Sequence, residues 1–207
     1  MTPADANTLS RLLRDGVAAD ADAAGKRFSE RAERDDLADV AYATYDSPFG
    51  TGHVAVTSRG VVAVRLPTWG TEDAFLDELA TGVSPRVLEL PGRLDEARRE
   101  LDQYFAGERR QFELALDWTL VRSGFYGRVL RETAKLPFGA TSTYGEIAAQ
   151  AGNPRAFRAA GTALGSNPIP IVVPCHRVLR AGGLIGEYGG GSEMKAALLQ
   201  LEGAITT

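Results

Sequence analysis

Apolar and polar positions alternate along the chain from residue 40 to residue 66. Three segments show the alternation of a short strand, and Gly, Pro and Ser residues separate them; these segments are 40–44, 53–57 and 61–66. This order of short strands and tight turns predicts a small antiparallel meander. A further alternation predicts one more strand later in the chain, carrying Phe112, Leu114 and Leu116.

Helical spacing lies between the meander and that last strand. Thr71 precedes two acidic residues and is expected to cap a helix over residues 74–79. Residues 94–105 have an apolar stripe with helical spacing, and Gly107 is expected to end that helix. Residues 40–117 therefore read as a small α/β unit.

After Trp118 the chain is predicted to be mostly helical. The three predicted helices cover residues 124–135, 144–150 and 155–164. Thr143 stands three residues before Glu146, which is the pattern of a capping box at the start of the second helix. The third helix is rich in Ala and Gly. Two short helices joined by a Gly-containing turn predict either a helix-turn-helix or an ordinary helical hairpin, and the pattern does not decide between them.

Residues 1–38 differ in composition from the rest of the chain. They are rich in Ala, Asp, Arg and Glu and have almost no β-branched residues. The spacing of Leu9, Leu12 and Leu13 predicts a short helix. We expect this part to be a mobile or loosely docked helical extension.

Composition restricts the class of protein. The 207 residues fit one large domain or two small ones. No apolar run reaches the roughly 18 residues that a membrane span needs, and residues 1–20 are too polar and acidic for a secretory signal. A lone cysteine cannot form an intramolecular disulfide, which predicts a cytoplasmic protein. One Cys and two His also argue against a structural zinc site, so we expect no metal.

The net charge of -4 is unevenly distributed. From Thr119 to the end there are nine Lys and Arg residues and five Asp and Glu, whereas the first 118 residues hold fourteen basic and twenty-two acidic residues. Such asymmetry indicates a basic binding face on the second half, as a nucleic-acid partner would require.

The stretch from Asn167 to Val178 carries the candidate chemistry. An apolar run leads into Pro174 and then into Cys175, His176 and Arg177. A neighbouring imidazole or positive charge favours the thiolate, which is the reactive form of cysteine. Adjacent residues on an extended strand point to opposite faces, so Cys175 and His176 need a bend or a bridging water to communicate. A buried cysteine beside a histidine that bonds a backbone carbonyl is the alternative reading.

The wider motif favours the reactive reading. The segment Pro174-Cys-His-Arg-Val follows Asn167-Pro-Ile-Pro and precedes Gly186-Glu-Tyr-Gly-Gly-Gly, Lys195 and Leu198-Leu-Gln-Leu-Glu-Gly. Together these residues resemble the O6-alkylguanine-DNA alkyltransferase family. The resemblance runs from about residue 125 to residue 203 and continues more weakly towards residue 46.

The resemblance implies a stoichiometric, irreversible transfer of an alkyl group to Cys175. His176 would deprotonate the thiol through a water, and Glu202 would orient His176. Tyr144 would supply a proton or hydrogen bond to the leaving guanine. Asn167 would brace the turn that carries the cysteine. No cofactor is expected, because the bond to the base already activates the alkyl group.

The resemblance also implies how DNA is held. Backbone groups of Cys175 and Val178 would read the guanine, and a lid over the base would be formed by Tyr188, Gly189 and Gly190. The target base must leave the duplex, and Arg158 would fill the gap that it leaves. Small residues would let the third helix approach the groove; they are Ala156, Ala159 and Gly161. The partner would be double-stranded DNA containing O6-alkylguanine, with O4-alkylthymine and cooperative assembly of a monomeric protein left open.

Three residues depart from the family pattern. Phe157 stands where alanine is common, and it is expected either to face the core or to alter the fit to the groove. Gly189 replaces a serine that hydrogen-bonds O6 in some members. Glu187 adds a carboxylate near the pocket rim.

Three alternative functions share parts of this pattern. Non-catalytic alkyltransferase-like proteins usually replace the cysteine, whereas Cys175 is present here. A transcriptional regulator that senses repair would need a cysteine-bearing metal domain, which the cysteine-free residues 1–38 cannot supply. A cysteine hydrolase usually has its Cys and His far apart in the sequence.

The fold class that follows is α/β + α. Residues 1–38 form the extension, residues 39–118 a ribonuclease-H-like α/β domain, and residues 119–207 a winged helix-turn-helix-like domain. The last of these is expected to hold both the DNA-reading helix and the alkyl-acceptor cysteine.

Overall fold

Mixed strands and helices build the described part of the chain. The computed structural model describes residues 24–29 and 31–206, and its residues up to Ala38 form a unit separate from the one that begins at Asp39. Residues 24–29 and 31–34 are helical. The helix predicted around Leu9 lies outside the described residues. Within the described part, no helix is both long enough and apolar enough to cross a membrane.

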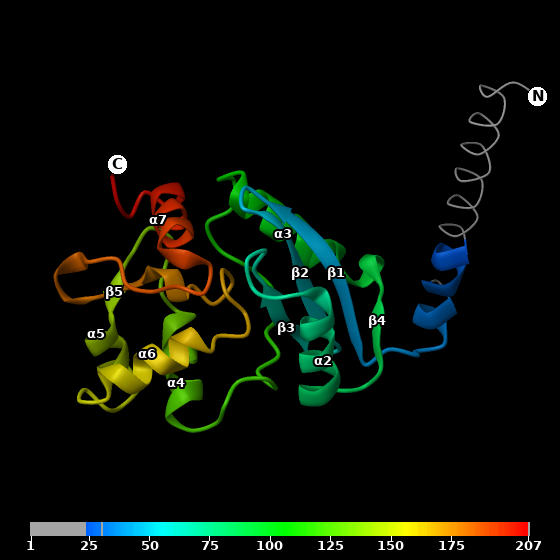
Figure 1. Ribbon diagram of the computed structural model, residues 1–207, viewed down its shortest axis with the longest axis horizontal. Coiled ribbons are helices and arrows are strands. Elements are labelled where there is room, and N and C mark those ends of the chain that lie inside the picture. The colour runs from blue at the N-terminus through cyan, green and yellow to red at the C-terminus, as the bar shows by residue number, and fades with distance from the viewer. Residues whose placement is uncertain (1–23, 30, 207) are drawn as a thin grey trace, which may run out of the picture. The chain divides into compact units, whose positions relative to one another are not determined.

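A four-stranded sheet occupies the first half of the larger unit (Figure 1). Its strands are β1 (Val40–Ser47), β2 (Gly50–Thr57), β3 (Gly60–Arg65) and β4 (Val87–Glu89), in the order β3-β2-β1-β4. The first three form the predicted antiparallel meander, and β4 lies parallel to β1. The pattern of apolar and polar positions did not predict β4, because three residues are too few to show an alternation.

Helices cover both faces of this sheet. On one face, Val40 and Tyr42 pack with Phe75 and Leu79 of α2 (Glu72–Gly82). Tyr45 stacks on Phe105 of α3 (Asp95–Phe105), which places α3 on the opposite face because side chains alternate along a strand. The Thr71 hydroxyl accepts the Ala74 N–H at 3.3 Å, so the predicted cap of α2 is confirmed. A short 3₁₀ turn, Pro91–Leu94, precedes α3.

The strand predicted from Phe112 to Leu116 is wrong. This segment makes only an isolated bridge between Leu116 and Val61 at the edge of β3. The alternating apolar side chains have another use, because they line a groove together with Leu136 and Phe138. Apolar alternation reports burial of one side of an extended chain, and it does not require a neighbouring strand.

The second half contains four helices that enclose the cysteine segment (Figure 1). They are α4 (Phe125–Thr133), α5 (Tyr144–Gln150), α6 (Phe157–Gly165) and α7 (Gly191–Leu201). Helices α4, α5 and α6 pack on one another. Two short strands, β5 (Ser142–Thr143) and β6 (Val178–Leu179), pair in parallel and place the start of α5 beside the cysteine turn. The sequence analysis assigned no helix to residues 191–201.

Local signals set the beginning of α5 as predicted. The Thr143 hydroxyl accepts the Glu146 N–H at 3.2 Å, and the Glu146 carboxylate accepts the Thr143 N–H at 2.7 Å. This capping box holds Tyr144 at the first position of the helix. The third predicted helix begins at Phe157 rather than at residue 155, since the turn after Gly152 extends to Ala156.

Candidate active site

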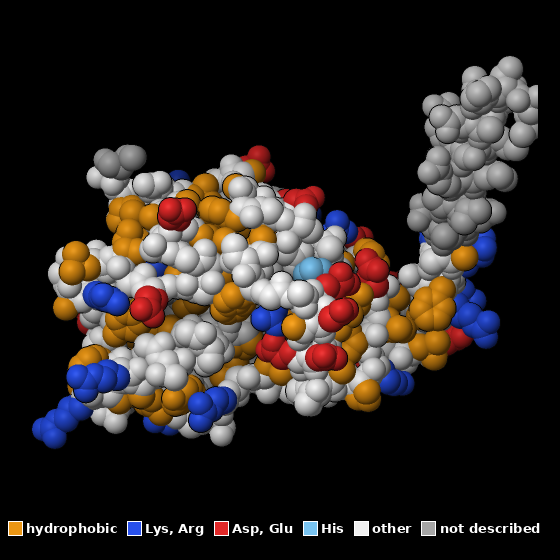
Figure 2. Space-filling model, viewed as in Figure 1, with side chains coloured by type: hydrophobic (Ala, Val, Ile, Leu, Met, Phe, Trp, Pro, Cys, Tyr) orange, Lys and Arg blue, Asp and Glu red, His pale blue; other side chains and the backbone are white. Residues whose placement is uncertain are grey.

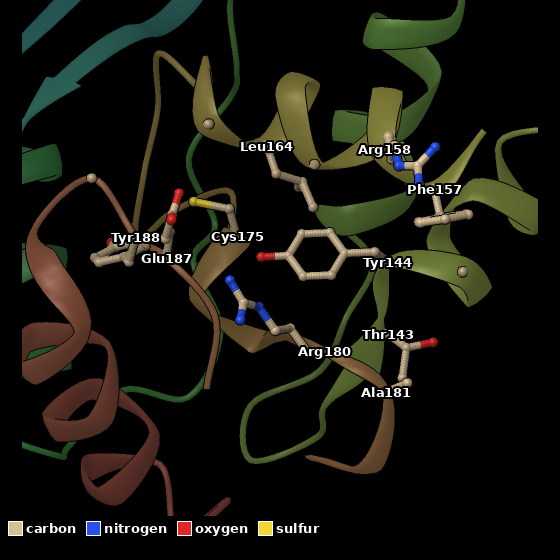
Figure 3. A pocket seen from close by; sticks show the side chains of 14 residues that line it. Thr143, Tyr144, Phe157, Arg158, Leu164, Cys175, Arg180, Ala181, Glu187 and Tyr188 are labelled. Atoms are coloured by element: carbon tan, nitrogen blue, oxygen red, sulfur yellow. The ribbon is translucent and has the colours of Figure 1, made fainter. Parts of the chain in front are cut away.

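A pocket of about 1000 Å³ opens beside the only cysteine (Figure 3). Its walls come from α5, from α6, from the cysteine turn with the segment that follows it, and from the loop before α7. Four of the sequence-predicted residues on its wall are Cys175, Tyr144, Tyr188 and Gly189. In Figure 3 the Tyr144 hydroxyl points across the pocket towards Cys175 and Arg180.

The backbone around Cys175 is tightly bent. Ile171 has a φ of 74°, which is unusual for a β-branched residue and marks local strain. After Pro174, the chain forms the 3₁₀ turn Cys175–Arg177. Of the two expected ways for Cys175 and His176 to communicate, a bend or a bridging water, the bend is therefore present. It turns Cys175 to the pocket, whereas His176 is 0% exposed.

The Asn167 side chain forms hydrogen bonds with the turn that carries Cys175 and with the residues before it. Its side-chain amide donates to the Val173 carbonyl at 2.8 Å and to Cys175 Sγ at 3.2 Å, and its carbonyl oxygen accepts the Ile169 N–H at 3.0 Å. All three of these side-chain hydrogen bonds join Asn167 to the cysteine segment, so it orients the sulfur as well as the backbone.

Glu202 is the centre of a buried network behind the cysteine turn. One carboxylate oxygen lies 2.9 Å from His176 Nε2 and accepts the Tyr104 hydroxyl at 2.8 Å. Arg177 donates to both carboxylate oxygens, each at 2.8 Å. Arg177 is thus paired internally. Burial acts to raise the pKa of Glu202, but the hydrogen bonds from His176 and Arg177 outweigh it and hold that pKa at about 2.

Burial disfavours the charged forms of both Cys175 and His176. Burial raises the pKa of the Cys175 thiol, although the Asn167 hydrogen bond and the charge of Lys195 oppose the rise. Burial also lowers the pKa of His176 below 6.5, against the effect of Glu202. A neutral imidazole can accept a proton, and a thiol with a raised pKa must lose one in order to react. His176 Nδ1 makes no hydrogen bond with any described residue, so it is free for this purpose.

Two basic residues near the cysteine were missed as site residues. Lys195 is fully buried and donates from Nζ to the Val178 carbonyl at 2.6 Å. Arg180 lines the pocket opposite Tyr144. Burial raises the pKa of Tyr144, and the charge of Arg180 opposes that rise. Lys195 had been noted only as part of a motif, and no signal in the sequence places Arg180 in the pocket.

The residues predicted to form the lid, Tyr188, Gly189 and Gly190, do not all line the pocket. The Tyr188 and His176 rings form a T-shaped pair with their centres 6.3 Å apart, and the Tyr188 hydroxyl has no hydrogen-bond partner among the described residues. Gly190 is the N-cap of α7 and does not line the pocket, and Val178, which is fully buried, does not line it either. Glu187 lines the pocket, as expected for a residue at its rim.

The predicted DNA-binding residues cluster at one end of α6. Arg158 and Gly161 line the pocket, Ala156 is the N-cap, and Ala159 is half-buried beside them. Phe157 is 48% exposed, which excludes the core-facing position that was one expectation for it. The Arg158 guanidinium lies 5.3 Å from the Phe157 ring.

Charge separates over the surface as the sequence composition suggests. On the face that Figure 2 shows, Lys and Arg side chains gather over α5 and α6, whereas Asp and Glu gather over α2. Among the described residues no group of three or more His, Cys, Asp or Glu could hold a metal ion. The pocket therefore combines one sulfur nucleophile with hydrogen-bond donors on a positively charged face.

Comparison with known proteins gives two family-model matches. Residues 40–118 match the ribonuclease-like domain of 6-O-methylguanine DNA methyltransferase, and residues 124–204 match its DNA-binding domain.

Individual relatives agree with the family models. A methylated-DNA–protein-cysteine methyltransferase of Mycobacterium tuberculosis is 40% identical over 79% of this chain and 92% of its own length. One from Methanosarcina acetivorans is 46% identical over 79% of this chain and 98% of its own length. The crystal structure of M. tuberculosis OGT in complex with DNA superposes with a TM-score of 0.67 at 39% identity, covering 78% of this chain and 92% of that one.

Proposed function

Because the chain belongs to the 6-O-methylguanine DNA methyltransferase family, we propose that Cys175 accepts the alkyl group that this protein removes from DNA. The protein acts in DNA repair by direct reversal, as a methylated-DNA–protein-cysteine methyltransferase with DNA as its partner. The observation that carries the proposal is the placement of its only cysteine, oriented by Asn167, on the wall of a pocket that could admit a flipped base.

His176 is the base in this proposal. It takes the thiol proton through a bridging water at Nδ1, while Glu202 holds Nε2 and stabilises the imidazolium that forms. The sulfur then attacks the alkyl carbon, a C–S bond forms and the C–O6 bond breaks. The electron pair of that bond stays on the guanine.

Tyr144 assists the leaving group. Its raised pKa keeps the hydroxyl protonated, so it can donate to the guanine as the C–O6 bond breaks. The product is a thioether on Cys175, which nothing in the pocket is placed to hydrolyse. Each molecule therefore repairs one lesion.

Helices α5 and α6 act as a helix-turn-helix that presents α6 to the minor groove. The small residues Ala156, Ala159 and Gly161 permit a close approach, and Arg158 enters the base stack at the edge of the pocket. The substrate is O6-alkylguanine in duplex DNA, flipped out of the helix. We place the protein in the cytoplasm as a monomer, since its buried lone thiol is suited to a reducing compartment.

The test is intact-protein mass spectrometry after mixing the protein with duplex DNA that contains O6-methylguanine. We expect the mass to rise by one methyl group, to saturate at one group per protein, and to map to Cys175. Binding of the lesion without any gain in mass would identify a lesion sensor instead. Transfer to another residue would overturn the role of Cys175.

The exposed position of Arg158 predicts a substrate-dependent effect. The change Arg158→Ala is expected to slow transfer from duplex DNA by roughly tenfold or more, because lost stacking of a few kcal/mol is no longer offset. Transfer from free O6-benzylguanine should change little, since no base has to leave a duplex. Single-turnover rates on both substrates measure the difference. Equal losses on the two would contradict a role in flipping.

The lowered pKa of His176 predicts the acid limb of the pH profile. Transfer needs a neutral imidazole, so its rate should hold as the pH falls through 6.5 and decline only at lower pH. Single-turnover rates across this range, with melting checked at each pH, measure the midpoint. A midpoint at or above 6.5 would show that burial does not lower the pKa of the group that must be neutral for transfer.

Removal of residues 1–38 should leave transfer intact. The family match begins at residue 40, and the described residues of the site all lie in the unit that begins at Asp39. A chain starting at Asp39 keeps the Asp39 hydrogen bonds with Arg86 and Ser84 at the start of β1. Methylation by the truncated and full chains should proceed at rates within about twofold. A folded but inactive truncation would assign a function to the extension.

A further inference from the structure

A tryptophan from the first half of the chain packs against the lid of the pocket. Trp69 lies in the turn after β3, where its backbone N–H donates to the Leu66 carbonyl at 2.9 Å. A Cβ atom placed on Gly189 would lie 2.2 Å from Cζ2 of Trp69 and 2.6 Å from its Nε1. Real Cβ atoms do not approach so closely, so the backbone at Gly189 sits directly on the indole ring. The position of Trp69 therefore leaves room only for glycine at position 189.

The indole ring is itself held in place. The Arg65 guanidinium carbon lies 5.6 Å from the centre of the Trp69 ring and 5.2 Å from that of Phe75 in α2. Arg65 also pairs with Glu78, another residue of α2. Arg65 thus ties the indole ring to the sheet and to α2, so moving the ring aside to admit a Cβ would disturb these contacts.

Gly189 contacts Trp69 and also lines the pocket that holds Cys175. It lines the pocket together with Glu187, Tyr188 and Cys175, and the Tyr188 ring forms a T-shaped pair with that of His176. The lid segment Glu187–Gly189 thus has Trp69 behind it and the pocket in front.

We propose that Trp69 is a positioning residue that sets the height of the lid segment over Cys175 and limits the size of the alkyl group that fits. The inference rests on the proposed transfer to Cys175. It also gives a physical reason for the departure at residue 189: serine cannot occur there while the indole occupies the space of its Cβ.

The test is a cycle of Gly189→Ala, Trp69→Ala and the double variant. Gly189→Ala should slow transfer from methylated duplex DNA by roughly 10- to 100-fold, because the added methyl displaces the lid. In the double variant the space is free, and the rate should return to within a few-fold of Trp69→Ala. If the two substitutions acted independently, their losses of rate would instead add up, and the double variant would be slower than either single variant. A double variant as slow as Gly189→Ala, or a Gly189→Ala protein with an unchanged rate, overturns the proposal.

A matched control uses the other tryptophan. Trp118 stacks with Arg131 and does not line the pocket, so Trp118→Ala should fail to rescue Gly189→Ala. Melting temperatures of all variants are compared, since a purely structural role would lower them without any rescue of rate. If the wild-type protein transfers methyl groups to Cys175 but the cycle shows no rescue, only this inference fails.

A second readout does not depend on the folding of the glycine variant. Trp69→Ala should raise the rate of benzyl transfer relative to methyl transfer by at least about threefold, because the lid can then move outward. Trp69→Phe, which keeps a flat apolar surface against Gly189, should stay near the wild-type ratio. An unchanged ratio in Trp69→Ala would contradict the control of alkyl size by Trp69.

Discussion

Replacing Cys175 by serine is expected to abolish alkyl transfer. Serine is nearly isosteric, and Asn167 can still donate to its hydroxyl as it does to Sγ. The hydroxyl is a far weaker nucleophile and far harder to deprotonate than the thiol, so the rate should fall by at least about 1,000-fold. Quantitative mass spectrometry of the protein after incubation with methylated duplex DNA measures this loss.

Binding provides the control for that variant. Affinity of Cys175→Ser for the same duplex should stay within about threefold of the wild type, because phosphate contacts, which the sulfur does not make, dominate affinity for DNA. A Cys175→Ser protein that still gains a methyl group would show that another residue accepts it. Loss of binding together with transfer would point to a folding defect.

Replacing Glu202 by glutamine is expected to damage both stability and chemistry. Glutamine keeps the shape, but it leaves Arg177, which is 5% exposed, without its counter-charge. Removing one partner of a buried ion pair costs about 3–5 kcal/mol in the free energy of unfolding. Transfer should slow by roughly 100-fold or more, because His176 loses the carboxylate that orients it.

The stability difference should depend on pH. The pKa of Glu202 is about 2 in the folded protein, below its usual value of 4.5, so ionised Glu202 stabilises the fold above pH 4.5. This contribution is lost as the pH falls from 4.5 towards 2. Urea unfolding should therefore show a large gap between wild type and Glu202→Gln near neutral pH and a smaller one in acid.

Glu193→Gln is a matched control in the same C-terminal region. Glu193 is exposed in the first turn of α7, so its loss should cost less than about 1 kcal/mol. A Glu202→Gln variant that is as stable as Glu193→Gln would contradict the claim that the buried contacts of Glu202 stabilise the fold.

Short-range signals in the sequence predicted the local structure well. Thr71 and Thr143 cap their helices as predicted, because a cap needs only residues within one turn. The need for a bend at Cys175 followed from the geometry of an extended chain, and a 3₁₀ turn supplies it. Strand β4 and the segment from Phe112 to Leu116 were misjudged, since pairing and burial there depend on distant parts of the chain.

The sequence by itself determined which chemistry the chain carries. A lone cysteine within a specific motif predicts the nucleophile, because the reactivity of a thiol depends on its residue type and its immediate neighbours. Only the tertiary structure decided what surrounds it. Tyr104 and Arg177 meet at Glu202, Arg180 enters the pocket, and Trp69 lies against Gly189. These contacts join residues up to 120 positions apart in the sequence. Only folding brings such residues together, so no local sequence pattern could predict the contacts.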